Sequence, residues 1–127
     1  MKRFQNPETI HAPLAAYTHQ IELTDVQRWL VLSGQVGMRA DGSLPDDPIE
    51  QFTVALDNIH KNLQASGMGI GDVVKLTIYL VGDIDTAKRR EVLADWLGGH
   101  APCSTLLYVA ALASPNIKVE IDAWACD

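Results

Sequence analysis

The sequence contains few cysteines, and this scarcity limits both its chemistry and its expected compartment. Only Cys103 and Cys126 occur among the 127 residues, and neither lies in a CxxC pair. Two cysteines cannot form a framework of several disulfides, so we expect two reduced thiols in a cytoplasmic protein. A single bridge between Cys103 and Cys126 stays open as an alternative. The basic start of the chain has no apolar stretch behind it, so we also expect no secretory signal.

Long apolar runs and an excess of positive charge are also missing. The longest apolar run, Leu106–Ala113, has eight residues, whereas a membrane-spanning helix needs about 20. The 10 Lys and Arg residues are outnumbered by 16 Asp and Glu residues, which gives a net charge of −6. An acidic chain repels phosphate backbones, so nucleic-acid binding would need a local basic patch, and a nucleic acid is not an expected partner. Because no apolar run is long enough to span a bilayer, no membrane partner is expected either.

Motifs for metal binding and for common catalytic loops are absent as well. The histidines, at positions 11, 19, 60 and 100, show neither HxH nor HxxxH spacing. The sequence has no GxxxxGK[ST] phosphate loop and no GxSxG nucleophile motif. We therefore expect no metal site.

The residues that are present indicate one α+β domain over residues 1–127. With 47% apolar and 20% charged residues, the chain can bury a core of its own. Asp47 is the expected N-cap of a helix over about 48–66, Glu50 stands where a capping box needs an acid, and Gly67 ends the helix. The helix is predicted from an apolar stripe at Ile49, Phe52, Leu56, Ile59 and Leu63.

A second, less regular helix is expected further along the chain. Asp83 or Asp85 is its N-cap, and Gly98 marks its end. Its early turns carry Lys88–Arg90, which we interpret as a solvated face. A basic patch for an anionic partner is the alternative interpretation.

Strands make up the rest of the predicted fold. They are expected over residues 16–23, 28–36, 72–81, 104–112 and 117–125. Two amphipathic helices can cover only one face of such a sheet. The uncovered face would carry Tyr79, Val81 and Trp124, and a contiguous apolar patch usually marks an interface. We therefore expect a homo-oligomer held together through this face.

The local sequence pattern alone marks two places as candidate functional sites. The stretch Ser33-Gly34-Gln35-Val36-Gly37 ends a predicted strand, where glycines let a ligand or another backbone approach closely. A bulge or bend explains the same glycines equally well. Glu120 lies within an otherwise apolar strand, so it belongs either to a solvent face or to a cleft for binding or proton transfer.

Five segments keep the order and spacing of one known family over about residues 13–125. They are Ser33-Gly34-Gln35, Ala55–Ile59, Asp72–Lys75 with Tyr79-Leu80, Pro102, and Lys118–Ala123. On these segments the chain resembles the RidA/YjgF family. The resemblance implies a chorismate-mutase-like fold, in which a mixed β-sheet is backed by two helices. It also implies a homotrimer with a central barrel-like core and a small-molecule cleft at each subunit interface.

The resemblance also implies an activity and a set of site residues. Members of the best-known type hydrolyse reactive 2-imino and 2-enamino acids to 2-oxo acids and ammonia, without metal or cofactor. Glu120 resembles the carboxylate that orients the attacking water. Tyr17 resembles the tyrosine that closes the cleft, whereas Ser33 and Gly34 resemble the strand end that lines it.

One departure from the family pattern follows Pro102. Active deaminases carry an arginine where this chain has Ser104, and that arginine clamps the substrate carboxylate. A hydroxyl cannot reproduce the bidentate, charge-assisted pair of a guanidinium. Either another cation replaces the arginine or the ligand is not a carboxylate. The candidate replacements are Arg28, Arg39, Lys75, Lys118 and His19.

These patterns lead to a functional expectation with alternatives. We expect a RidA-like protein that binds a small metabolite and hydrolyses an imine- or enamine-type substrate. A non-catalytic sensor or carrier of the same fold is the alternative, and an RNA-directed activity is disfavoured by the net charge of −6. Cys103 is expected to be an inert thiol, because nucleophilic catalysis needs a nearby base and none is adjacent in sequence.

Overall fold

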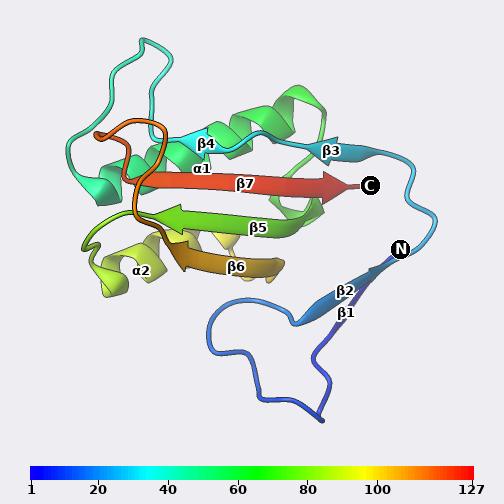
Figure 1. Ribbon diagram of the computed structural model, residues 1–127. Helices are drawn as coiled ribbons and strands as arrows, with labels where there is room; N and C mark the ends of the chain where they lie inside the picture. The colour runs from blue at the N-terminus through cyan, green and yellow to red at the C-terminus, as the bar shows by residue number, and fades with distance from the viewer.

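The computed structural model describes residues 1–127 as two helices packed on one face of a mixed sheet (Figure 1). The helices are α1 (Pro48–Ala65) and α2 (Thr86–Leu97), with a short 3₁₀ turn, η1 (Ile70–Asp72), between them. The strands are β1 (Lys2–Gln5), β2 (Gln20–Leu23), β3 (Trp29–Val31), β4 (Gln35–Val36), β5 (Val73–Leu80), β6 (Cys103–Tyr108) and β7 (Val119–Cys126). The predicted α+β class, a mixed sheet backed by two helices, is confirmed.

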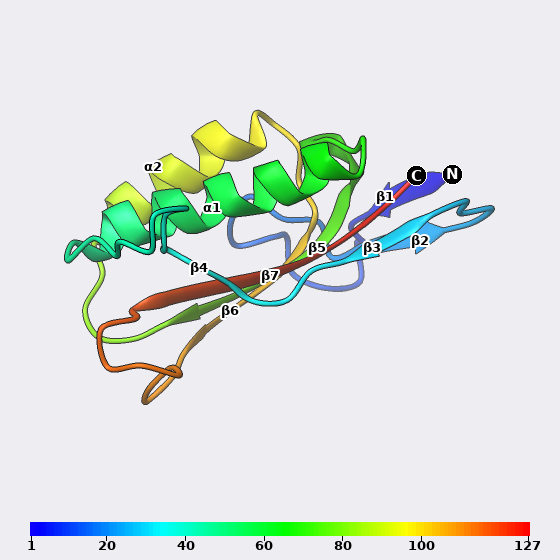
Figure 2. The same cartoon turned by 90° about the horizontal axis from the view of Figure 1, so that it is seen from above.

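The sheet has one covered and one open face. Its strand order is β3-β7-β5-β6, and β4 pairs with β7 beyond β3. Strands β5 and β6 are parallel, whereas β5 and β7 are antiparallel. Figure 2 shows α1 and α2 on the same side of this sheet and no helix on the other side. The expectation that both helices cover one face is therefore confirmed.

Helix α1 supplies much of the core, as its apolar stripe predicts. Four stripe residues, Phe52, Leu56, Ile59 and Leu63, are buried. The Asp47 carboxylate caps the helix by accepting a hydrogen bond from the Ile49 backbone N–H at 3.2 Å. These residues pack on the alternating apolar residues of β5 and β7, which explains why the two central strands are the best buried.

Helix α2 begins and ends where the sequence indicates. The Asp85 carboxylate, one of the two expected caps, accepts a hydrogen bond from the Lys88 backbone N–H at 3.0 Å. Gly98 ends the helix in the left-handed conformation, with φ of 58°.

The N-terminal hairpin was not predicted. Strand β1 pairs antiparallel with β2, and Lys2 Nζ lies 3.1 Å from Asp72 Oδ1, which joins the hairpin to the body of the protein. The segment Lys2–Gln5 is mostly exposed and has no apolar alternation. Since the strand that pairs with β1 is distant in sequence, no local pattern predicts β1. The strand predicted over 28–36 is also divided, because β3 and β4 are separated at Leu32–Gly34.

The open face of the sheet carries large apolar side chains. Trp29, Val31, Leu107 and Trp124 have exposed fractions of 52%, 54%, 41% and 45%. The rings of Trp29 and Trp124 meet edge to face, with centroids 6.1 Å apart. Of the three side chains expected here, Trp124 is exposed, whereas Tyr79 and Val81 are half-buried. This patch is therefore larger than the sequence suggested.

A buried glutamine on α1 fixes the loops beside the sheet. The side chain of Gln51 donates hydrogen bonds to the carbonyls of Pro45 and Asn116, at 2.8 and 2.9 Å. Its oxygen accepts a hydrogen bond from the Lys118 backbone N–H at 2.8 Å. Gly37 packs directly on this residue, since a Cβ added at Gly37 would lie 2.4 Å from Gln51 Cα.

We expect Gly37→Ala to destabilise the protein by about 1–3 kcal/mol, because the added methyl group meets backbone atoms that cannot turn aside. Urea unfolding followed by circular dichroism measures the effect as a lower midpoint. Gly69→Ala is the matched control. Its added Cβ meets nothing within 4 Å, and its φ of −129° suits any residue. Equal midpoints for the two variants would contradict this account of Gly37.

Candidate functional site

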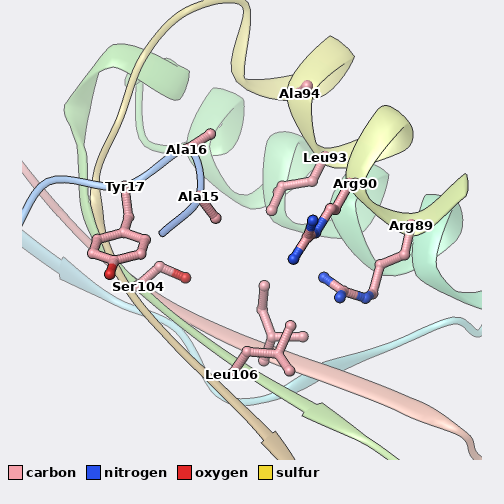
Figure 3. A pocket seen from close by; sticks show the side chains of 10 residues that line it. Ala15, Ala16, Tyr17, Arg89, Arg90, Leu93, Ala94, Ser104 and Leu106 are labelled. Atoms are coloured by element: carbon pink, nitrogen blue, oxygen red, sulfur yellow. The ribbon is translucent and has the colours of Figure 1, made fainter. Parts of the chain in front are cut away.

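A cavity of about 370 Å³ lies between α2, the edge strand β6 and the loop before β2 (Figure 3). Small-molecule sites commonly occupy roughly 300–1,000 Å³, so the cavity fits a compact metabolite. Most of the lining is apolar and includes Ile78, Leu93 and Leu106. The lining residues with charged or hydroxyl groups are Tyr17, Arg89, Arg90 and Ser104.

Tyr17 reaches the cavity because its loop is fastened to the start of β6. The neighbouring Thr18 is buried and donates a hydrogen bond from its hydroxyl to the Ala101 carbonyl at 2.6 Å. The Tyr17 hydroxyl accepts a hydrogen bond from the Leu14 backbone N–H at 3.1 Å, which closes the loop on itself. The Tyr17 ring also meets the His19 ring edge to face, with centroids 5.5 Å apart. The loop therefore presents Tyr17 as one wall of the cavity.

Ser104 lies on the helix-covered side of the sheet. It pairs in register with Leu76, a core residue of β5, and side chains at paired positions share a face. Tyr17 and Ser104, which the sequence placed in one site, thus share one cavity.

Cys103 points to the other side of β6. Its sulfur lies 3.8 Å from the backbone oxygen of His19, while the His19 ring nitrogen Nε2 is 2.8 Å from the His11 carbonyl. The His19 nitrogen Nε2 is therefore engaged by a carbonyl and not by this thiol. Both Cys103 and Cys126 are free, so the alternative of a bridge between them is wrong.

Glu120 lies on the open face, opposite the cavity. It pairs in register with Tyr79 of β5, and the core residues Val119 and Ile121 on either side of it point toward the helices. Gly34 makes room for its side chain, since a Cβ at Gly34 would lie 2.7 Å from Glu120 Cδ. A close approach to this glycine does occur, but the group that makes it is the Glu120 side chain and not the ligand or second backbone that the pattern suggests.

The surroundings of Glu120 are polar and acidic. The Tyr79 hydroxyl donates a hydrogen bond to Asp122 at 3.4 Å. The negative charge of Asp122, together with partial burial and this hydrogen bond, raises the pKa of Tyr79, and Glu120 adds to the same effect. The Tyr79 hydroxyl therefore keeps its proton, and its role as a hydrogen-bond donor, to a higher pH than an isolated tyrosine.

The expected site residues therefore fall into two groups within one chain. Tyr17 and Ser104 face the cavity on the covered side of the sheet. Gly34 and Glu120 lie together on the open side, next to the exposed Ser33. Because the sheet separates the groups, a single chain does not bring Glu120 to the cavity.

Two arginines of the cavity were not among the expected site residues. Arg89 and Arg90 were interpreted as part of a solvated face, and for Arg89 this is wrong, since only 7% of it is exposed. A sequence signal did exist. Arg89 precedes Leu93 and Leu97 by four and eight positions, so it lies on the buried face of α2.

The cations proposed as replacements for the missing arginine are located elsewhere. None of the five lines the cavity. Arg28 pairs with Asp127, Arg39 lies 3.7 Å from Glu50, and Lys75 donates a hydrogen bond to the Thr105 hydroxyl at 2.7 Å. The pairing of Arg39 also shows that Glu50 directs its carboxylate to a loop cation.

No three His, Cys, Asp or Glu side chains are grouped so that they could ligate a metal ion. Neither helix combines the length and the apolar character needed to cross a membrane.

Comparison with known proteins supplies the family. The family model described as Endoribonuclease L-PSP matches residues 9–126. The 2-iminobutanoate/2-iminopropanoate deaminase of Mus musculus is 33% identical over 119 residues, covering 92% of this chain and 87% of the relative. YyfB of Yersinia pestis, from the Rid family, superposes with a TM-score of 0.87 at 30% identity, covering 99% of this chain and 98% of the other.

A second similar structure contains a small ligand. Escherichia coli TdcF with bound serine superposes with a TM-score of 0.72 at 25% identity, and the match covers 99% of each chain. With a family model spanning nearly its whole length and a 33% identical deaminase among its relatives, the chain belongs to the RidA/YjgF family.

Proposed function

We propose that this protein hydrolyses a small imine- or enamine-type metabolite to a carbonyl compound and ammonia, in clefts between the subunits of a homotrimer. The observation that carries the proposal is the cavity of about 370 Å³ that joins Tyr17 and Ser104. Two relatives support the reaction class. One is named putative reactive intermediate deaminase TdcF, from Escherichia coli, and the other 2-iminobutanoate/2-iminopropanoate deaminase, from mouse. In this proposal Tyr17 and Ser104 bind the substrate, whereas Ser33 and Gly34 line the cleft.

Glu120 is the proposed catalytic residue. Its carboxylate accepts a proton from a water molecule as the water oxygen bonds to the carbon of the protonated imine. The resulting carbinolamine carries a hydroxyl and an amino group on one carbon. Glu120 returns this proton to the nitrogen and then accepts the hydroxyl proton as the C–N bond breaks, so that ammonia leaves and a neutral carbonyl forms.

The separation of Glu120 from the cavity supports an intersubunit cleft. Within one chain the sheet lies between Glu120 and Ser104. A rotationally symmetric ring joins unlike surfaces of neighbouring copies. We propose that each cleft combines the cavity of one protomer with Glu120 of the next. The exposed apolar open face provides the surface for this contact.

A non-catalytic metabolite sensor or carrier is the second candidate. The observation that favours it is Ser104, which replaces the carboxylate-clamping arginine of active deaminases. We do not propose a nucleic-acid partner, because the net charge of −6 opposes one. The two free thiols support the expected cytoplasmic location.

Turnover of a freshly generated 2-imino acid distinguishes the two candidates. The hydrolase releases 2-oxo acid and ammonia faster than buffer alone, and the rate rises in proportion to protein concentration. A sensor or carrier leaves the rate at the buffer value. That second result, obtained across several imino acids, would contradict the proposed hydrolysis.

Subunit complementation tests the intersubunit cleft. Ser104→Phe fills the cavity at a strand position that accepts aromatic residues, and Glu120→Gln disables the other half-site. Each homotrimer should be nearly inactive. Mixed trimers refolded from equal amounts should recover about one quarter of wild-type turnover, because random mixing pairs two intact halves in that share of clefts. Mixed trimers no more active than either parent would contradict a shared cleft.

A further inference from the structure

The cavity contains two guanidinium groups and no carboxylate. Arg89 and Arg90 both line it, and none of the other lining residues is acidic. Neither arginine takes part in any of the ion pairs formed within the chain. Figure 3 shows both guanidinium groups directed into the space between α2 and β6, with the Ser104 hydroxyl across from them.

Arg89 is the more unusual of the two arginines. It is only 7% exposed, and its Nε atom is buried without a hydrogen-bond partner. A buried donor that lacks a partner is costly, and a buried guanidinium is normally paired with an anion. Arg90 beside it is exposed, but it adds a second positive charge at the mouth of the same cavity, which repels the first. The arrangement is therefore short of a negative group.

An oxyanion is the group that satisfies this arrangement. A guanidinium presents parallel N–H donors that match the two oxygens of a carboxylate or the oxygens of a phosphate. Two guanidiniums at one end of a mostly apolar cavity would bind such a group, while the apolar walls accept a short carbon chain. Because Ser104 carries no charge, the positive charge that would bind such an anion comes from the two arginines of α2.

We propose that Arg89 and Arg90 form an anion-binding subsite in the cavity, which holds the oxyanion of a small organic ligand. This subsite on α2 provides the anion binding that Ser104, on β6, cannot provide. As a statement about the substrate, this inference rests on the proposed function, because it says that the imine substrate carries a carboxylate or a phosphate group. Ligand binding can nevertheless be measured without turnover.

The test is equilibrium binding of pyruvate and of inorganic phosphate to the assembled wild-type protein, by calorimetry at fixed ionic strength. Methyl pyruvate, which lacks the carboxylate, is the uncharged comparison. Arg89→Met and Arg90→Met keep much of the side-chain volume and remove the charge. Lys88→Met is the matched control, because it removes a charge of the same sign from an exposed neighbouring position of α2.

Wild type should bind at least one of the two anions, and Lys88→Met should bind that anion with the same affinity as wild type. Both proteins should bind methyl pyruvate much more weakly than that anion. Each arginine variant should bind that anion about 10- to 100-fold more weakly, as expected for the loss of a charged hydrogen bond. Preference for pyruvate assigns the subsite to a carboxylate, and preference for phosphate assigns it to a phosphate.

Three results would overturn the subsite. They are wild type that binds neither anion, arginine variants that bind as well as wild type, and a loss in Lys88→Met equal to that in the arginine variants. A protein that binds pyruvate through Arg89 and Arg90 but turns over no imine would retain the subsite and lose the hydrolase assignment. The two proposals therefore fail separately.

Discussion

Replacing Glu120 by glutamine should lower imine turnover by about 10²–10⁴-fold, the range expected for a group that accepts a proton from the attacking water. Glutamine keeps the shape of the side chain and its hydrogen-bonding end but cannot take up the proton. The side chain still fits over Gly34, where the present carboxylate packs so closely that a methyl group would lie 2.7 Å from Cδ. Steady-state rates of 2-oxo acid release measure the effect.

The matched control is Asp122→Asn. It removes the same charge from the same face of β7, two positions away. We expect its turnover to stay within a few-fold of wild type, and light scattering should report the same assembly for both variants. If the two substitutions reduced turnover equally, the general charge of the face would matter rather than the position of Glu120, and its catalytic role would be wrong.

Replacing Trp124 by glutamate should dissociate the trimer. The indole is 45% exposed in one chain and lies edge to face on Trp29, at the centre of the open apolar face. A carboxylate buried there without a partner costs several kcal/mol in each subunit. We expect wild type to scatter as about three times the 13.9 kDa chain mass, and Trp124→Glu to scatter as a single chain.

Turnover should disappear together with the assembly, because each proposed cleft takes its two halves from different subunits. Ile10→Glu is the control, since Ile10 is exposed to a similar extent, 49%, but lies outside the main sheet. Its mass and turnover should match those of wild type. A wild-type protein that scatters as a monomer at micromolar concentration would remove the support for the trimer and for the shared cleft.

Most of the fold follows from local patterns. The stripe from Phe52 to Leu63 has the period of a helix, and the alternation along β5 and β7 has the period of a strand. Asp47 marks the start of α1 because its side chain caps the first turn, and Gly98 marks the end of α2 because glycine readily adopts the left-handed conformation. Such features act over a few residues, so a single sequence is enough to reveal them.

The missed elements all depend on contacts between distant residues. Strand β1 forms only because β2 lies beside it, about 20 positions later, and its own residues are mostly exposed. Gln51 has no apolar character, yet it is buried because three loop backbone groups converge on it. Neither feature has a local signature.

For the site, the available side chains could be identified from the sequence, whereas which of them come together depends on the folded chain. Glu120 and Ser104 were both identified from the pattern, but the sheet places them on opposite faces, because neighbouring residues of a strand alternate sides. Arg89 is assigned to solvent by its charge, but in the fold it lies in the cavity between α2 and the sheet and is only 7% exposed. Burial of a charge is a property of the assembled fold, since it depends on which surfaces exclude water around that charge.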